Sequence, residues 1–327
     1  MPHPIEIQNL RLRYPETGRV VLHGIDMVVR QGEVKLLLGP SGSGKSSLAL
    51  TLNGLIPHQM EGEIRGVVLI NGVDTTTTQV AALTTQVGLL FQDPDAQIAT
   101  LTVADEVAFG MENLRVPPAE MPARIDTALA RVDMAGMNGR GTDALSGGQK
   151  QRLSLASTLA MGAAILVFDE PTANLDPAGT TSFFDLLSRL KAEGATILII
   201  EHKLDDLIAR VDSVAVLGLD GKIAADGPPT QVLQEQRELL HELGVWVPQV
   251  TELANALTTC DVTLNPYPLT IEDAVAAIKN GPWLWNNRVS QATQPDHTGG
   301  ESGADGIPAL QIEDLTYRYP SGTLALN

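Results

Sequence analysis

Apolar and polar positions follow two different patterns over the first two thirds of the chain. Residues Ile5–Arg13 and Val20–Arg30 alternate apolar with polar side chains, which is typical of strands with one buried face. Val34–Leu38, Ile165–Phe168 and Thr196–Ile200 are almost unbroken apolar runs, as in strands that are buried on both faces. The pattern therefore predicts two kinds of strand.

Helical patterns lie between these apolar runs. They cover Ser46–Leu55, Gly148–Met161 and Thr180–Glu193. Short apolar strands that alternate with helices indicate an α/β domain with a mainly parallel central sheet.

A helical extension, residues 228–285, is expected after this domain. Gly227, Pro228 and Pro229 close the α/β region, and Thr230–Gly244 then has the pattern of one amphipathic helix. Thr270–Asn280 predicts another helix, whose apolar face would contain Ile271, Ala274, Val275 and Ile278.

Residues 286–308 have the composition of a flexible acidic linker. Between Gln294 and Gly306 no apolar side chain is larger than Ala or Pro, and Asp296, Glu301 and Asp305 add negative charge. An ordered surface loop is the alternative interpretation.

The end of the chain repeats its beginning. Ile5–Pro15 matches Leu310–Pro320 at a constant offset, and Gly18 and Leu22 match Gly322 and Leu326 if one residue is deleted. A chance resemblance between two Tyr-Pro strands is the alternative. The tandem repeat predicts that residues 309–327 are the start of a second, truncated domain.

The charge balance excludes some classes of protein. The chain of 327 residues has 22 basic and 39 acidic residues, for a formal net charge of −17. This argues against a protein that coats nucleic acid and against a basic membrane-surface protein. The single cysteine, Cys260, excludes an intrachain disulfide and a cysteine-cluster zinc site, and it suggests a reducing compartment.

No membrane-spanning or secretion segment is predicted. The longest apolar stretch, Leu159–Phe168, is far shorter than the ~20 residues of a spanning helix. Residues Met1–Asn9 lack a basic segment followed by an apolar run. We therefore expect any membrane role to depend on a partner.

A phosphate-binding loop follows the apolar run Val34–Leu38. The segment fits the pattern G-x-x-x-x-G-K-[ST] and lies between a predicted strand and a predicted helix. Its residues are Gly39, Pro40, Ser41, Gly42, Ser43, Gly44, Lys45 and Ser46. Glycines let successive backbone N–H groups face an anion, and the helix that follows adds its dipole. Lys45 would reach the β and γ phosphates, and the Ser46 hydroxyl would bind Mg²⁺.

Two acidic residues end a buried strand. Ile165–Phe168 leads directly into Asp169 and Glu170. Beside a phosphate loop, Asp169 would lie next to Mg²⁺, and Glu170 would polarise the attacking water as general base.

Two further polar residues follow apolar runs. His202 comes after Thr196–Ile200, where parallel sheets bind ligands, and it could contact the γ-phosphate or the attacking water. Taken alone, a histidine at this position favours a structural role. Gln92 follows Val87–Phe91 and, taken alone, could be a solvated side chain.

The segment Leu145–Gln149 (LSGGQ), together with these motifs, resembles the signature of ATP-binding cassette (ABC) ATPases. The resemblance covers residues 3–227 and, as a fragment, 309–327. It implies the P-loop NTPase fold of an ABC nucleotide-binding domain, with a mainly parallel central sheet, an antiparallel β subdomain and a helical subdomain. It also implies ATP hydrolysis with Mg²⁺.

The resemblance assigns roles to individual residues. Tyr14 would stack on adenine, and Ser47 would join residues 39–46 in the nucleotide site. Gln92 would be the Q-loop glutamine and a Mg²⁺ ligand, and His202 would be the switch histidine beside the catalytic Glu170. Asn174 stands in the D-loop, where the family usually has a smaller residue.

The signature residues would serve a partner domain. Their glycine N–H groups and the dipole of the helix that starts there form a second anion site, which lies too far along the domain for its own phosphate loop. These residues are Ser146, Gly147, Gly148 and Gln149. In the family two ATP molecules lie between two such domains, so we expect a second ABC domain or a second copy as partner.

Finer resemblance indicates energy-coupling factor (ECF) importers. The segments that carry it are Leu52–His58, Phe91–Ile98, Thr102–Asn113 and Glu201–Leu204. It implies a transmembrane scaffold subunit and a small substrate-binding membrane protein as partners, at the cytoplasmic face of the cell membrane. The imported molecule would be a vitamin, a thiamine precursor or a metal ion.

Two other functions compete with this one. A ribosome-associated tandem ABC protein should carry a basic helical linker, whereas residues 228–309 are acidic and interrupted by Pro and Gly. The ATPase of another ABC transporter, such as an exporter, is disfavoured by the segment Gln92–Gln97. The 106 positions from Gly39 to Leu145 leave no room for the coiled coil of chromosome-type ABC ATPases.

Overall fold

The computed structural model describes residues 2–258, 262–280, 317–318 and 324–326. The chain divides into two compact units, Met1–Gly281 and Pro282–Asn327, which are described separately.

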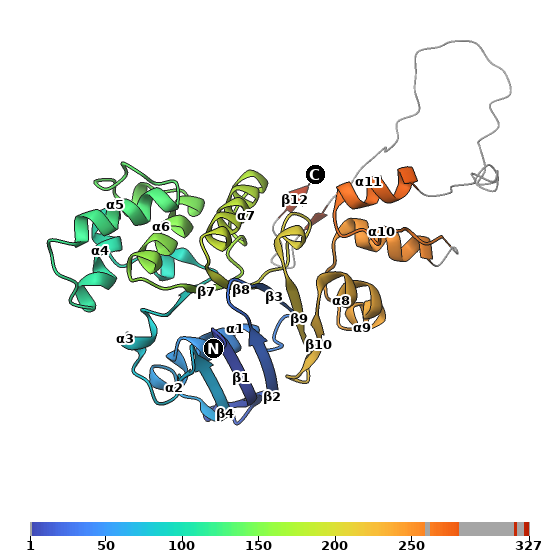
Figure 1. Cartoon of the computed structure of the whole chain (residues 1–327), viewed down its shortest axis with the longest axis horizontal. Coiled ribbons are helices and arrows are strands. Elements are labelled where there is room, and N and C mark those ends of the chain that lie inside the picture. Colours follow the sequence, from blue (N-terminus) through green and yellow to red (C-terminus); the bar gives the residue numbers. More distant parts are fainter. Residues whose placement is uncertain (1, 259–261, 281–316, 319–323, 327) are drawn as a thin grey trace, which may run out of the picture. The chain divides into compact units, whose positions relative to one another are not determined.

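A six-stranded sheet forms the centre of the first unit (Figure 1). Its order is β10-β9-β3-β8-β7-β6. The strands are β3 (Val34–Leu38), β6 (Val87–Leu90), β7 (Ile165–Asp169), β8 (Thr196–Ile200), β9 (Ser213–Leu217) and β10 (Ile223–Gly227). All neighbours pair in parallel except β10, which runs antiparallel to β9. The predicted mainly parallel sheet is confirmed, and the carboxyl ends of β3, β7 and β8 lie at one edge.

A second, antiparallel sheet has the order β2-β1-β4-β5. Its strands are β1 (Ile5–Arg13), β2 (Val20–Val29), β4 (Glu63–Ile70) and β5 (Val73–Asp74). Apolar side chains from both sheets form one buried cluster with Leu48, Ala49 and Leu52 of α1 (Lys45–Leu52). Helix α1 therefore holds the two sheets together directly after the phosphate loop.

The other face of the central sheet is covered by helices. They are α4 (Val103–Asn113), α5 (Met121–Arg131), α6 (Gly147–Ala160) and α7 (Pro177–Ala192). Helices α4, α5 and α6 pack on one another at one end of the unit, as the predicted helical subdomain (Figure 1). Shorter helices join these parts: α2 (Leu55–His58), α3 (Val80–Leu83), and the 3-10 turns Pro94–Ala96, Thr142–Ala144 and Ile208–Arg210.

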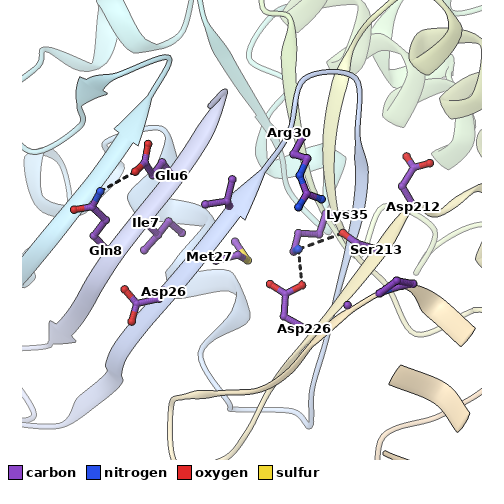
Figure 2. Close-up of a pocket in the computed structure, with 13 residues that line it drawn as sticks. Glu6, Ile7, Gln8, Asp26, Met27, Arg30, Lys35, Asp212, Ser213 and Asp226 are labelled. Carbon is purple, nitrogen blue, oxygen red and sulfur yellow. Dashed lines mark hydrogen bonds and ion pairs between the residues drawn. The ribbon is translucent and has the colours of Figure 1, made fainter. Parts of the chain in front are cut away.

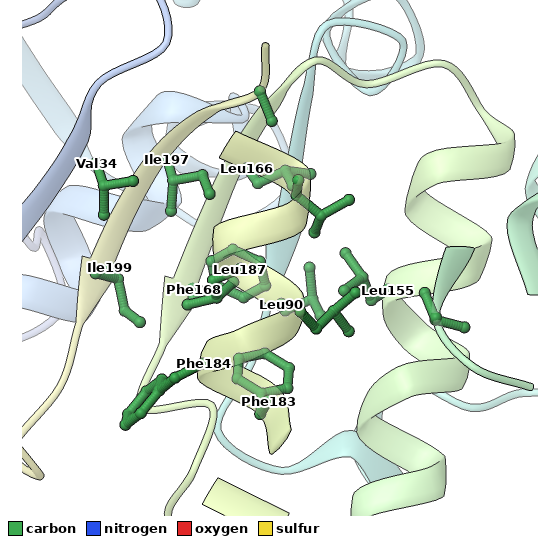
Figure 3. Packing of buried hydrophobic residues seen from close by; sticks show 14 of the residues in the cluster. Val34, Leu90, Leu155, Leu166, Phe168, Phe183, Phe184, Leu187, Ile197 and Ile199 are labelled. Atoms are coloured by element: carbon green, nitrogen blue, oxygen red, sulfur yellow. The ribbon is translucent and has the colours of Figure 1, made fainter. Parts of the chain in front are cut away.

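The largest side chains of this helical face pack around β7 (Figure 3). The rings of Phe168 and Phe183 meet edge to face, with centroids 5.6 Å apart and an interplanar angle of 88°. Each is buried, and burial of such a side chain contributes about 1.5–3 kcal/mol. Strand β7, which delivers Asp169, is thus anchored from the side opposite α1.

Several predicted helix boundaries were wrong. Helix α1 ends at Leu52, and not at Leu55, because Gly54 adopts a left-handed backbone (φ 75°) that an α-helix cannot contain. Helix α7 begins at Pro177, three residues before the prediction, because Asp176 caps it by accepting a hydrogen bond from the Gly179 amide.

The helical extension differs from its prediction in two ways. The single helix expected over Thr230–Gly244 is two helices, α8 (Pro229–Glu235) and α9 (Arg237–Glu242), separated by Gln236 with non-helical dihedrals (φ −103°, ψ 21°). No glycine or proline explains this break. Helix α10 (Gln249–Thr258) was not predicted.

Helix α11 (Ile271–Asn280) confirms the second predicted helix of the extension. Its expected apolar face is divided: Ala274 is buried, whereas Ile271, Val275 and Ile278 are 66%, 42% and 46% exposed. Ala277, which was not assigned to that face, is also buried.

The second unit is described only at two short strands. β11 (Tyr317–Arg318) and β12 (Leu324–Leu326) pair in antiparallel fashion. The predicted acidic linker, residues 286–308, lies outside the described residues.

Within the described part of the chain, none of the helices has the length and apolar character needed to cross a membrane.

Candidate nucleotide site

The phosphate loop connects β3 to α1 through three glycines with positive φ. Gly39, Gly42 and Gly44 have φ values of 150°, 78° and 106°. A Cβ at Gly39 would collide with the carbonyl oxygen of Leu217, and one at Gly44 would lie 2.8 Å from Cγ1 of Val21. The backbone conformation favours glycine at all three positions, and neighbouring residues also exclude a side chain at Gly39 and Gly44.

The Lys45 ammonium group lies inside this loop. Its Nζ donates hydrogen bonds to the carbonyl oxygens of Gly39 (2.8 Å) and Pro40 (3.0 Å). Burial lowers the pKa of Lys45, and the carboxylates of Glu170 and Asp169 act in the opposite direction. A cation held in a cradle of backbone amides fits a polyphosphate.

Ser43 gives an independent indication that the loop fits an anion. Its side chain is 2% exposed, and its hydroxyl oxygen has no hydrogen-bond partner. A buried hydroxyl without a partner is costly, and a bound oxyanion would accept a hydrogen bond from it. The loop residues present thus fit a phosphate group.

A cavity of about 550 Å³ opens beside the loop. Among the residues predicted for the nucleotide site, its lining includes Tyr14, Ser41, Gly42, Gly44, Lys45, Ser46, Ser47, Gln92 and Glu170. The Tyr14 and Ser47 hydroxyl oxygens lie 2.9 Å apart, so the first turn of α1 fixes the ring of Tyr14 at the rim of the cavity.

Asp169 ends β7 next to the phosphate loop. Burial raises the pKa of Asp169, while a hydrogen bond from the Ser46 side chain lowers it. A carboxylate and a hydroxyl side by side are oxygen donors of the kind that Mg²⁺ prefers. No cluster of three or more His, Cys, Asp or Glu side chains suited to a metal occurs among the described residues, and Mg²⁺ on phosphates needs only one or two carboxylates.

Three predicted catalytic residues meet at Glu170. Gln92 Nε2 donates a hydrogen bond to Glu170 Oε2 (3.1 Å), and His202 Nε2 lies 3.1 Å from Glu170 Oε1. Glu170 has a positive φ of 48°, which is rare for a residue with a side chain and typical of functional sites. The ends of β6, β7 and β8 therefore bring Gln92, Glu170 and His202 together.

The signature residues lie elsewhere. Ser146 caps α6: its hydroxyl accepts a hydrogen bond from the Gln149 amide (3.3 Å), and the Gln149 side chain accepts one from the Ser146 amide (3.1 Å). None of the residues Ser146–Gln149 lines the nucleotide cavity. The start of α6 is thus a capped helix N-terminus that does not line the nucleotide cavity of the same domain.

Sequence reasoning missed four residues that line the cavity. They are Glu16, Thr17, Arg19 and Val21. They belong to the turn between β1 and β2 and to the start of β2. Only their place directly after Tyr14 could have indicated them, because no motif marks them.

A separate cavity of about 710 Å³ lies between the two sheets, toward the amino end of β3 (Figure 2). There the buried Lys35 Nζ donates hydrogen bonds to Asp226 Oδ1 (2.6 Å) and Ser213 Oγ (3.2 Å). None of the predicted nucleotide-site residues lines this cavity.

Comparisons with known proteins agree with this geometry. A family model described as "ABC transporter" matches residues 22–173. A Methanosarcina mazei protein named "Putative ABC transporter ATP-binding protein" is 37% identical over 331 residues, covering 98% of this chain and 55% of the relative. The Bacillus subtilis protein named "Putative HMP/thiamine import ATP-binding protein YkoD" is 40% identical over 256 residues, covering 78% of this chain and 47% of the relative.

A solved structure is also similar. CbiO1 from Clostridium perfringens, described as part of the ABC transporter complex CbiONQ, is 31% identical with a TM-score of 0.65, covering 78% of this chain and all of that one. The chain belongs to the ATP-binding proteins of the ABC transporter family and has the fold of an ABC ATPase. It spans about half the length of the curated relatives named here.

Proposed function

We propose that this chain hydrolyses ATP to power an energy-coupling factor importer of a small molecule. The observation that carries the proposal is a cavity beside the phosphate loop that is lined by Lys45, Ser46 and Glu170. Asp169 is hydrogen-bonded by the Ser46 side chain, and His202 contacts the Glu170 carboxylate. Membership of the ABC transporter family supports the ATPase part, and the motifs after Gln92 support the importer part.

Each residue has a proposed task in hydrolysis. Backbone amides of Gly42–Ser46 and the Lys45 ammonium hold the phosphates, and Tyr14 stacks on the base. Glu170 accepts a proton from the attacking water, and His202 hydrogen-bonds the γ-phosphate or that water. The contacts of Gln92 and His202 with Glu170 orient its carboxylate for this task.

Ser46, Asp169 and Gln92 are the residues that would hold Mg²⁺. When bound, the ion neutralises charge that develops on the transferred phosphate. Gln92 hydrogen-bonds Glu170, so the same side chain would link the metal side of the site to the base.

We propose that the start of a second ABC domain lies at residues 309–327. The strand pairing supports this, because the second unit repeats the register of the first. The matching pairs are Leu12 with Leu22 and Tyr317 with Leu326, then Arg13 with Val20 and Arg318 with Leu324. An irregularity separates the two pairs in both units, and the one-residue deletion between the matched segments of the sequence accounts for the numbering.

A second domain would complete the nucleotide site. Ser146–Gln149 present a helix N-terminus that does not line the chain's own cavity. We propose that this signature binds the ATP held by the partner domain, and that the partner's signature binds the ATP held here.

A groove beside the Q-loop is the proposed docking site for the transmembrane scaffold. Its cavity of about 230 Å³ is lined by parts of β6, α4 and α6, and by Phe91, Gln97 and Phe109. Phe109 is 47% exposed. A half-exposed aromatic ring at the edge of a groove suits a helix of a partner. Docking there would place the chain at the cytoplasmic face of the membrane.

The substrate class is proposed from the relatives. YkoD is named for import of HMP/thiamine, and CbiO1 belongs to the CbiONQ complex. We therefore propose a vitamin, a thiamine precursor or a metal ion as cargo.

The test is to tag the protein, extract its complexes from membranes in mild detergent and identify the co-purifying chains by mass spectrometry. We expect a large membrane scaffold and a small hydrophobic membrane protein, whose ligand would name the cargo. Ribosomal proteins, or no membrane protein, would contradict the importer and leave only the ATPase.

A further inference from the structure

Three consecutive residues after β8 hold the segment that follows β7. The Glu201 carboxylate accepts a hydrogen bond from the Thr172 hydroxyl. Lys203 Nζ donates to the carbonyl oxygens of Thr172 (2.8 Å) and Leu175 (3.1 Å). Between them, His202 reaches Glu170. We call Thr172 and Glu201–Lys203 the strand-end clamp.

Glu201 is the buried centre of this clamp. Its residue surface is 2% exposed and that of Thr172 is 0% exposed. The second oxygen, Oε2, accepts a hydrogen bond from the His202 amide at 2.9 Å. One carboxylate therefore binds both the backbone of His202 and the turn that carries Glu170.

Such an arrangement is unlike ordinary core packing. Burial raises the pKa of Glu201 to about 7, which shows that the charged form is poorly solvated here. An apolar side chain would fill this space without that cost. Glu201 does not line the nucleotide cavity, so the proposed hydrolysis gives it no direct task.

We propose that Glu201 is a positioning residue that fixes His202 and Glu170 in the one arrangement in which their side chains meet. Through Thr172 it holds the turn after Glu170, and through the His202 amide it sets the start of the switch segment. Buried polar contacts of this kind select a single geometry because every alternative leaves a group unpaired. The inference rests on the proposed roles of Glu170 and His202.

The test compares Thr172→Val with Thr172→Ser. Valine has nearly the shape of threonine but removes the hydroxyl that Glu201 binds, whereas serine keeps it. We expect Thr172→Val to lower kcat about 10-fold or more, because small displacements of catalytic groups are costly. ATP affinity should stay within about twofold in both variants, since neither residue lines the cavity, and Thr172→Ser should keep most of the parent's kcat.

Glu201→Gln is the second variant, and it is used also if Thr172→Val does not fold. Only one of the two terminal atoms of glutamine accepts hydrogen bonds, so glutamine cannot bind the Thr172 hydroxyl and the His202 amide with separate atoms as the carboxylate does. We therefore expect kcat to fall again at unchanged ATP affinity. Equal kcat values for Thr172→Val, Glu201→Gln and the parent would overturn the proposal. Equal losses of kcat and of ATP affinity would overturn it too, because they would indicate a general distortion.

Glu170→Gln separates this inference from the proposed function. If Glu170→Gln blocks turnover while the clamp variants do not, only the clamp is refuted. If the Glu170→Gln variant hydrolyses ATP at the parent's rate, the proposed role of Glu170 is refuted. The proposal for Glu201 is then refuted as well, because it requires a catalytic Glu170.

Discussion

Glu170 combines an unusual backbone with two side-chain contacts. Its φ is positive, and Gln92 and His202 both contact its carboxylate. A strained conformation of this kind persists only when its surroundings determine it. The carboxylate is thus held in place by the two neighbouring strand ends before any water reaches it.

Glu170→Gln should block turnover and leave ATP bound. The amide cannot accept the proton of water, and loss of a general base costs about 100-fold to 10,000-fold in rate. Steady-state hydrolysis and ATP titration measure the two properties. Glu61→Gln, at an exposed carboxylate outside the cavity, is the matched control. Equal hydrolysis rates for Glu170→Gln and the parent would refute the general base.

Lys45→Ala should abolish ATP binding. The ammonium group is the cation that the loop holds for the phosphates, and no other lysine lines the cavity. Equilibrium titration with a fluorescent ATP analogue measures this. An unchanged affinity for the ATP analogue would contradict the assignment of residues 39–46 as a phosphate-binding loop.

Glu201 should make stability depend on pH. Its pKa is about 7 in the folded chain against an ordinary 4.5, so between these values the folded state binds a proton that the unfolded chain has released. The free energy of unfolding should therefore fall as pH rises from 4.5 to 7, by about 3 kcal/mol at most, and then level off. Urea unfolding of the parent and of Glu201→Gln, which cannot titrate, measures this difference. Parallel pH profiles of the two proteins would contradict it.

Residue identities at the site were largely predictable, whereas some contacts were not. The order of motifs assigned Lys45, Asp169 and Glu170, because phosphate chemistry needs a lysine at the end of the phosphate loop and carboxylates at the end of a neighbouring strand. The clamp at Thr172 and Glu201 escaped prediction because it joins residues 29 positions apart through a buried hydrogen bond. No local pattern marks such a pair.

At the scale of elements, the packing of β6 against α6 connects the core with the Q-loop. Gly88 of β6 faces the Thr158 side chain of α6 so closely that a Cβ would collide with it. Strand β6 then delivers Gln92 to the site. The glycine allows the helix that carries the signature to lie directly on the strand that leads to the Q-loop.

Gly88→Ala should destabilise the fold by about 1–3 kcal/mol, because an added methyl group in a packed core forces neighbours apart. Thermal unfolding measures the change. Gly139→Ala is the control, since a Cβ there has no neighbour within 4 Å. If both variants unfold at the parent's melting temperature, Gly88 and Thr158 are not in tight contact.

Strands were easier to predict than helix limits. Solid apolar runs such as Val34–Leu38 match their strands, because a strand buried on both faces admits few polar residues. The break at Gln236 was missed because apolar periodicity continues through it. Helix α10 was missed between two clearer helices.

At the scale of the whole molecule, exposed apolar side chains occur at several places among the described residues. One is the groove with Phe109, and another is the stripe Ile271, Val275 and Ile278 on α11. The groove lies beside the Q-loop segment, so a protein docked there would contact the element that carries Gln92.

Phe109→Asp should reduce capture of the membrane scaffold at least about 10-fold while ATP binding stays unchanged, since charge in an apolar interface is costly. Quantitative co-purification from membranes measures it. Leu219→Asp is the control, because Leu219 is exposed and does not line the groove. Equal capture by both variants and the parent would place the docking site elsewhere.

The Lys45 hydrogen bonds have a consequence for how ligand enters. By binding the carbonyl oxygens of Gly39 and Pro40, the ammonium group braces the loop from within. An incoming nucleotide replaces these hydrogen bonds of Lys45 with bonds to its phosphates. Because the loop is already ordered, little conformational entropy of the loop is lost when the nucleotide binds. Nucleotide association should then be fast. Protein from which nucleotide has been removed by dialysis should bind nucleotide again without a slow phase.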